Sequence, residues 1–143
     1  MQLFRLRPAW DGCDVTYMTT DKQLRALLLE DAARRNQSPP ELIVFTDANR
    51  WQRKQLLLSF VSILVAVIRI RPDIIVTTGA APGYFAIRLG RLIGCRTIWI
   101  DSIANVETLS MSGSMAGRYC DLWLTQWPHL EAPRGPWFKG SVL

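Results

Sequence analysis

The sequence predicts an α/β protein built on a doubly wound, Rossmann-like parallel sheet. Five short runs rich in β-branched or aromatic residues alternate with helical segments along the chain. Such alternation is typical of parallel strands that are connected by helices. The runs are mostly apolar, as strands buried on both faces are. The five predicted strands are Asp14–Thr19, Leu42–Phe45, Ile74–Thr77, Thr97–Ile100 and Leu122–Thr125.

Helical segments fill the intervals between these strands. A helical stub at Gln2–Arg7 comes first, and Asp21 is expected to cap a helix that continues through Ala32 and ends before Pro39. A further helix is expected at Tyr84–Ile93. The 143 residues, 49% of them hydrophobic, suffice for one domain with a substantial core, so we expect a single domain over residues 1–143.

The most informative stretch is the turn Thr77–Gly83, because it joins the third strand to a helix N-terminus. Such a turn exposes backbone N–H groups, and the helix dipole favours an anionic or hydroxyl-rich ligand there. The spacing is not GxGxxG and the P-loop lysine is absent, so neither a dinucleotide site nor an NTPase is predicted. Alternatively, Gly79 and Gly83 serve only to allow tight packing.

Charge and cysteine content narrow the function classes. The net charge of +5 is mostly due to arginine, and a basic surface could face a phosphorylated substrate, an anionic membrane or only solvent. Nucleic acid is disfavoured, because the aromatic residues are not interleaved with the basic ones. Cys95 and Cys120 lie beside apolar strands and are expected to be buried, reduced thiols. His129 is the sole histidine, so we predict neither a metal site nor a cofactor.

The segment from Leu56 to Ile68 is apolar on nearly every face. At about 1.5 Å per residue it covers roughly 20 Å, which is less than the ~30 Å core of a bilayer. Basic residues flank both ends, as expected for a helix that lies at an anionic membrane interface. A helix that packs against a partner protein is the alternative interpretation.

Several ordered motifs resemble the PssD-type family. Its members are bacterial relatives of the membrane-anchoring subunit of the two-component UDP-N-acetylglucosamine transferase that acts on dolichol-linked oligosaccharide. The resemblance spans about Gln2 to Leu143 and is densest from Arg71 onward. The motifs that carry it are Arg71–Gly83 (RPDIIVTTGAAPG), Thr97–Val106 (TIWIDSIANV), Leu109–Gly113 (LSMSG), Asp121–Pro128 (DLWLTQWP) and Gly140–Leu143 (GSVL).

The resemblance implies the N-terminal, acceptor-binding half of a GT-B glycosyltransferase, a fold that includes MurG. A separate, smaller subunit resembling the C-terminal half would bring UDP-N-acetylglucosamine, so this chain would be active only with that partner. Part of the contact could involve Trp127, Trp137 and Phe138, because aromatic residues are enriched at interface centres. Alternatively, these side chains pack back on the sheet. The implied product is a lipid-pyrophosphate-linked glycan for exopolysaccharide, made at the cytoplasmic face of the inner membrane.

The resemblance also implies roles for individual residues. Asp101, where relatives more often have glutamate, is the candidate catalytic carboxylate that orients an acceptor hydroxyl. Asn105 stands where relatives usually have arginine, which removes a fixed positive charge. Each polar candidate has a turn or helix cap as its alternative role. The expected substrate-binding residues are Thr78, Gly79, Pro82, Gly83, Ser102, Asn105, Ser110 and Gly113.

Relatives begin with a further strand and a Gly-Gly-His turn that are absent ahead of Gln2 in this sequence. That strand would be central in the sheet, so we expect the first strand to be missing and two strands to lack a shared partner. The expected domain is then incomplete at its N-terminus. Two other functions stay open: a scaffold that only recruits a glycosyltransferase, and an unrelated phosphate-binding module.

Overall fold

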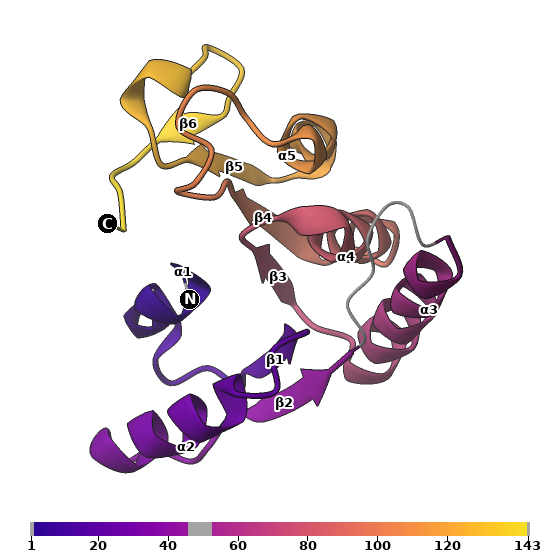
Figure 1. The fold of residues 1–143 in the computed structure, drawn as a ribbon, viewed down its shortest axis with the longest axis vertical. Helices are drawn as coiled ribbons and strands as arrows, with labels where there is room; N and C mark the ends of the chain where they lie inside the picture. Colours follow the sequence, from indigo (N-terminus) through magenta and orange to yellow (C-terminus); the bar gives the residue numbers. More distant parts are fainter. Residues whose placement is uncertain (1, 46–52, 143) are drawn as a thin grey trace. The chain divides into compact units, whose positions relative to one another are not determined.

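The computed structural model describes residues 2–45 and 53–142. The chain divides into two compact units, Pro8–Ser62 and Met1–Arg7 with Ile63–Leu143, and the division falls within helix α3. Figure 1 shows the elements of both units along the chain.

The smaller unit contains two parallel strands and the helix that connects them. Strand β1 (Thr16–Thr19) pairs with β2 (Glu41–Val44), and α2 (Leu24–Arg34) lies between them in the chain. The turn η1 (Arg7–Trp10) precedes β1, and α3 (Arg53–Ile70) begins in this unit. The buried apolar residues here are Tyr17, Leu28 and Ala32.

Asp21 does not cap α2, contrary to the sequence prediction. The helix begins at Leu24, and its N-cap residue Gln23 makes no side-chain capping bond. Asp21 Oδ1 instead accepts a hydrogen bond of 2.8 Å from the Gln23 N–H, ahead of the helix. An aspartate that bonds its backbone two residues on makes a turn of its own, and this turn competes with capping.

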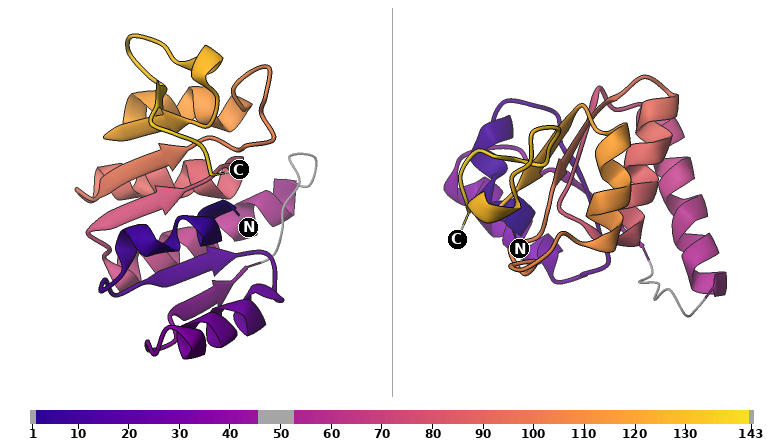
Figure 2. Two further views of the ribbon diagram at one scale, coloured as in Figure 1. Left: turned by 90° about the vertical axis from the view of Figure 1, so that its left-hand side faces the viewer. Right: turned by 90° about the horizontal axis from the view of Figure 1, so that it is seen from above.

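The larger unit is a four-stranded parallel sheet in the order β3-β4-β5-β6. Helices α4 and α5 lie on one face of this sheet and α1 lies on the other (Figure 2). Strand β6 has only two residues, too few to give a periodic signal in the sequence. The elements are α1 (Gln2–Arg5), β3 (Ile74–Thr77), α4 (Ala80–Leu92), β4 (Arg96–Ile100), α5 (Met111–Ala116), η2 (Gly117–Tyr119), β5 (Leu122–Thr125), η3 (Pro128–Leu130) and β6 (Trp137–Phe138).

The strands form two separate sheets, in agreement with the expectation that two strands lack a shared partner. Strands β1 and β2 form the first and β3 to β6 the second, with β3 at an edge of the larger sheet in the part of the chain that the structure describes. All the predicted strands are present, within two residues of their expected bounds, and all pair in parallel. The parallel α/β class is confirmed.

The core of the larger unit forms between α4, α5 and β4. Ile87, Trp99 and Ala116 are fully buried and pack together. Two glycines of α4 bring this helix close to β3, because a Cβ at Gly83 would overlap the side chain of Thr77 and a Cβ at Gly90 would lie 2.5 Å from Ile75 Cδ1. The close contact between the helix and the strand thus depends on two small residues that lie on the same face of α4.

Helix α3 buries one side and exposes the other. Ser59, Ile63, Ala66 and Val67 are buried. The exposed apolar residues follow helical spacing along a different side, which we call the outer stripe of α3: Leu57, Leu58, Val61, Val65 and Ile68, each 44% to 62% exposed. Within the segments described, no helix combines the length and apolar character needed to cross a membrane.

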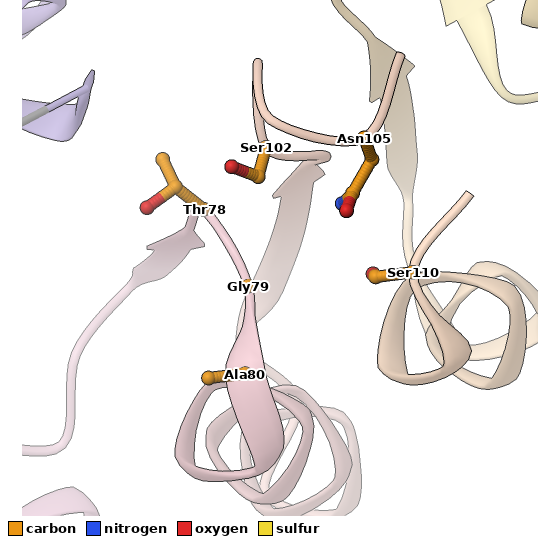
Figure 3. A pocket seen from close by; sticks show the side chains of 6 residues that line it. All are labelled: Thr78, Gly79, Ala80, Ser102, Asn105 and Ser110. Carbon is orange, nitrogen blue, oxygen red and sulfur yellow. The ribbon is translucent and has the colours of Figure 1, made fainter. Parts of the chain in front are cut away.

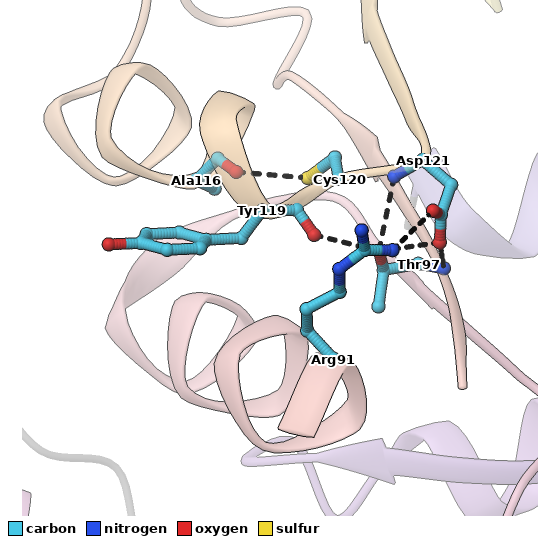
Figure 4. Close-up of polar contacts among 6 residues, drawn as sticks. All are labelled: Arg91, Thr97, Ala116, Tyr119, Cys120 and Asp121. Atoms are coloured by element: carbon cyan, nitrogen blue, oxygen red, sulfur yellow. Dashed lines mark hydrogen bonds and ion pairs between the residues drawn. The ribbon is translucent and has the colours of Figure 1, made fainter. Parts of the chain in front are cut away.

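Polar contacts at the amino ends of β4 and β5 hold these strands together (Figure 4). Asp121 Oδ2 accepts from the Thr97 N–H at 2.8 Å, and Asp121 Oδ1 accepts from Arg91 Nη1 at 2.6 Å. These hydrogen bonds and the Arg91 charge lower the pKa of the Asp121 carboxyl, the Thr97 N–H bond contributing most.

We expect the free energy of unfolding to fall in the acid pH range, in part because Asp121 becomes protonated. A carboxyl whose pKa is lower in the folded state stabilises the fold above its unfolded pKa, and this contribution is lost as pH falls through the folded pKa. Urea unfolding of the wild type and of Asp121→Asn at several pH values measures it. The stability difference between the two should be constant above about pH 5 and shrink below about pH 4. A difference that does not change with pH would contradict this assignment.

Of the two thiols predicted to be buried, Cys95 is buried and Cys120 is only partly buried. Cys95 is buried, and burial and the Asp73 charge raise its pKa. Cys120 donates through Sγ to the Ala116 carbonyl oxygen, and its burial raises the pKa to about 12. A raised pKa lowers the fraction of each thiol that is present as the nucleophilic thiolate.

Candidate functional site

A pocket of about 390 Å³ lies at the carboxyl ends of β3 and β4. In an open parallel sheet this edge is where ligands bind. Figure 3 shows its two walls, the turn between β3 and α4 and the loop that follows β4, which we call the 101–110 loop. The lining residues are Thr78, Gly79, Ala80, Ser102, Asn105 and Ser110.

The turn leaves backbone donors free at the start of α4. Gly79 is the N-cap residue with φ 137° and ψ −165°, and Ala80 follows with φ 61°. The Gly79 N–H donates to Thr77 Oγ1 at 3.3 Å, and no side chain caps the helix. Since Pro82 has no N–H, the first helical turn offers the N–H groups of Ala80 and Ala81, which have no helical carbonyl partner. These groups and the helix dipole favour an anionic or polar oxygen.

Asp101 lies behind the pocket wall. It is 1% exposed, and its carboxylate accepts four hydrogen bonds. Oδ1 accepts from Trp99 Nε1 at 3.1 Å and from Ser110 Oγ at 2.7 Å. Oδ2 accepts from Asn105 Nδ2 and from the Ser110 N–H, both at 3.1 Å. Asp101 is absent from the lining, so the predicted catalytic carboxylate reaches the pocket only through Asn105 and Ser110.

Residues distant in sequence fix the backbone of the 101–110 loop. Gln2 in α1 donates from Nε2 to the Asp101 carbonyl oxygen and accepts the Ile103 N–H, both at 3.0 Å. Trp127 Nε1 donates to the Ile103 carbonyl oxygen at 3.1 Å. The His129 ring bonds through Nε2 to the Val106 carbonyl oxygen at 2.6 Å. The sole histidine therefore anchors a loop.

The structure brings together five of the predicted site residues: Thr78, Gly79, Ser102, Asn105 and Ser110. Pro82 and Gly83 lie in the first turn of α4 and do not line the pocket, and Gly83 packs against Thr77. Gly113 has no room for a side chain, because its Cβ would lie 2.6 Å from Asp101 Oδ1. It supports the carboxylate network from behind.

Sequence reasoning missed Ala80 as a lining residue and Gln2, Trp127 and His129 as anchors of the 101–110 loop. Ala80 directly follows Gly79, so its place in the turn was the only available signal. The three anchors act on backbone atoms more than 20 residues away, and no local pattern in the sequence indicates such bonds.

The basic surface, which the sequence left open as a contact for a phosphorylated substrate, a membrane or only solvent, does not line the pocket. All six lining residues are uncharged. Arg91 pairs with Asp121 at the amino ends of the strands, and Arg88 stacks over the Tyr119 ring with 4.1 Å from Cζ to the ring centroid. The pocket therefore offers neutral hydrogen-bonding groups and a helix N-terminus instead of cations.

The aromatic residues near the C-terminus pack partly into their own unit. Trp127 is half-buried and bonds to the 101–110 loop, and Trp137 and Phe138 form β6 beside β5. Each keeps some exposed surface, so the contact with a partner stays a prediction for these side chains.

The fold of this chain is that of a MurG-like GT-B protein, of which the chain matches a part. The structure superimposes on the crystal structure of Acinetobacter baumannii MurG with a TM-score of 0.67, over 94% of this chain and 39% of that one. The two sequences are 12% identical, so this likeness concerns the fold alone.

The chain belongs to the family described as "Oligosaccharide biosynthesis protein Alg14 like", whose model matches residues 51–140. It is 31% identical over 121 residues to the UDP-N-acetylglucosamine transferase subunit ALG14 of Yarrowia lipolytica, covering 78% of this chain and 51% of that protein. It is 35% identical over 74 residues to the subunit of the same name from Mus musculus, covering 46% and 33%. The chain thus spans about half or less of these relatives.

Proposed function

We propose that this protein is the acceptor-binding and anchoring subunit of a two-component glycosyltransferase. In this proposal the complex transfers N-acetylglucosamine, or a related sugar, from its UDP-sugar to a lipid-pyrophosphate-linked glycan. The observation that carries the proposal is the polar pocket at the carboxyl ends of β3 and β4, in a chain of the Alg14-like family. The finer assignment to exopolysaccharide is carried by the resemblance to the PssD-type family.

The pocket has the chemistry to hold the head of such an acceptor. The N–H groups at the start of α4 are donors for pyrophosphate oxygens, and they need no charged side chain to act. The hydroxyl group of Ser102 and the amide group of Asn105 face the same space (Figure 3) and suit the hydroxyls of a sugar. A sugar pyrophosphate fits this combination better than a fully apolar ligand does.

Catalysis in this proposal requires a second subunit. Among the described residues that line the pocket there is no carboxylate and no imidazole, and a general base must come within hydrogen-bond reach of the acceptor hydroxyl. The smaller GT-B C-terminal-half subunit would bring the UDP-sugar site. The same observation favours a second candidate, a scaffold that positions the acceptor and recruits the transferase without contributing to the chemistry.

We propose peripheral attachment to the cytoplasmic face of the inner membrane through α3. The outer stripe of this helix exposes five apolar side chains, and the exposed side chains of Lys54 and Arg69 lie near its two ends. An apolar stripe with flanking cations suits an anionic lipid interface.

Titration calorimetry with UDP-N-acetylglucosamine tests the division of labour. The purified chain alone is expected to give no heat of binding and no transfer or hydrolysis. Addition of the partner subunit should yield sugar transfer to a lipid-pyrophosphate acceptor. Tight binding of the sugar nucleotide by this chain alone would place the donor site here and overturn the two-component proposal. Acceptor binding without any transfer by the complex would favour the scaffold.

A further inference from the structure

The Asn105 side chain is held in one orientation by Asp101. The carboxylate offers only acceptors, and Asn105 Nδ2 lies 3.1 Å from Asp101 Oδ2. Oδ2 also accepts the Ser110 backbone N–H, and Oδ1 accepts the Trp99 indole N–H. Both of these N–H groups can only donate, so both carboxylate oxygens must act as hydrogen-bond acceptors.

A rotation of the Asn105 amide by 180° would place its carbonyl oxygen against Asp101 Oδ2. Two hydrogen-bond acceptors would then face each other, so one hydrogen bond would be lost and a repulsive contact would replace it. The amide is therefore fixed with its NH2 group toward Asp101, and Oδ1 is left as the free end. Asn105 points into the pocket beside Ser110 (Figure 3).

The hydroxyl of Ser110 is already engaged. It donates to Asp101 Oδ1 at 2.7 Å and accepts the Gly113 N–H at 2.9 Å, as the N-cap of α5. It cannot donate to a ligand without breaking the bond to Asp101. Asn105 Oδ1 is thus a fixed acceptor on this side of the pocket, and its orientation depends on Asp101.

We propose that Asp101 is a positioning residue and Asn105 a specificity-determining residue. Asp101 fixes the orientation of the Asn105 amide. Asn105 Oδ1 then selects a sugar acceptor that presents a hydrogen-bond donor to it, either a hydroxyl or an acetamido N–H. The inference rests on the proposed function, since it names which feature of the lipid-linked sugar the site recognises. A guanidinium at position 105 has only donors, so it would instead select a substrate oxygen that accepts a hydrogen bond.

Acceptor analogues test the selection with the chain and its partner subunit together. The panel is a short-chain prenyl-pyrophosphoryl-N-acetylglucosamine, its single-deoxy derivatives and the derivative with the acetamido nitrogen replaced by oxygen. With the derivative that lacks the donor bound by Asn105 Oδ1, kcat/KM of the wild-type complex should be at least about tenfold lower than with the intact acceptor. Asn105→Leu, which has nearly the same shape, should use that member and the intact acceptor about equally well.

Asp101→Asn should also reduce this selectivity, since an amide at position 101 lets the Asn105 amide turn. Val106→Ala, an exposed side chain of the same loop, should retain the wild-type preference. Two results would contradict selection by Asn105. Either Asn105→Leu keeps the full preference for the intact acceptor, or the wild type uses every derivative as well as the intact acceptor. A wild-type complex that transfers to no acceptor would instead contradict the proposed function.

Nuclear magnetic resonance tests the positioning without any activity. In the 15N-labelled chain, the Asn105 side-chain NH2 signals, identified by their loss in Asn105→Leu, should be shifted downfield and exchange slowly with water. Asp101→Asn should move them and speed their exchange, while thermal melting shows whether the variant is folded. Signals at free-amide positions with fast exchange in the wild type would overturn the lock.

Discussion

Replacing Gly79 by valine is expected to reduce sugar transfer by the complex at least about 100-fold while the fold persists. The Cβ at this position would meet nothing within 4 Å, so a branched side chain would stand in the pocket where the acceptor approaches the Ala80 and Ala81 N–H groups. The glycine also holds φ 137° with ψ −165°, a conformation nearly restricted to glycine. The strain of a substitution there is about 1–3 kcal/mol.

Gly94→Val is the matched control for this experiment. Gly94 lies just beyond the other end of α4 with φ 85°, and its Cβ would likewise meet nothing within 4 Å. It carries a comparable backbone strain away from the pocket. We expect both variants to lose similar thermal stability and only Gly79→Val to lose transfer. Equal activity of the two would show that the acceptor does not approach this turn.

Replacing Leu57, Val61 and Val65 by serine is expected to release the protein from vesicles that contain anionic lipid. Full burial of such a side chain stabilises by about 1.5–3 kcal/mol. Even if the three side chains insert only partly, their removal should therefore lower the partition coefficient between vesicle and water by roughly 100-fold or more. The three residues are 62%, 44% and 58% exposed. Phe60 and Leu64 are only partly exposed, so substituting them would also disturb packing.

Sedimentation with vesicles measures this release, and a triple substitution of other exposed apolar residues provides the control. Leu29, Leu92 and Val106 are 51%, 76% and 45% exposed and lie outside α3. Their replacement by serine should leave binding nearly unchanged. Raised salt should weaken binding of the wild type, because the cations beside the stripe are screened. Wild-type protein that stays in the supernatant with anionic vesicles would refute the interfacial role of α3.

The strands and their parallel pairing were predictable, because each strand is a short apolar run with its own local signal. The place of the pocket followed from the same pattern. Parallel strands end at one edge, so the residues after β3 and β4 had to lie near each other. Thr78, Gly79, Ser102, Asn105 and Ser110 line the pocket for this reason. The strand β6 has only two residues and gave no periodic signal, so it was not predicted.

The order of strands and loops along the chain places these side chains at the same edge, whereas contacts between distant segments set what each side chain does there. Asp101 follows β4 as predicted, yet donors from Trp99, Asn105 and Ser110 surround its carboxylate and keep it behind the wall. Gly79 opens into the pocket, whereas Gly83 packs against Thr77. Backbone periodicity is local and can be read along the chain, whereas the direction of a polar side chain depends on donors and acceptors that folding brings from distant segments.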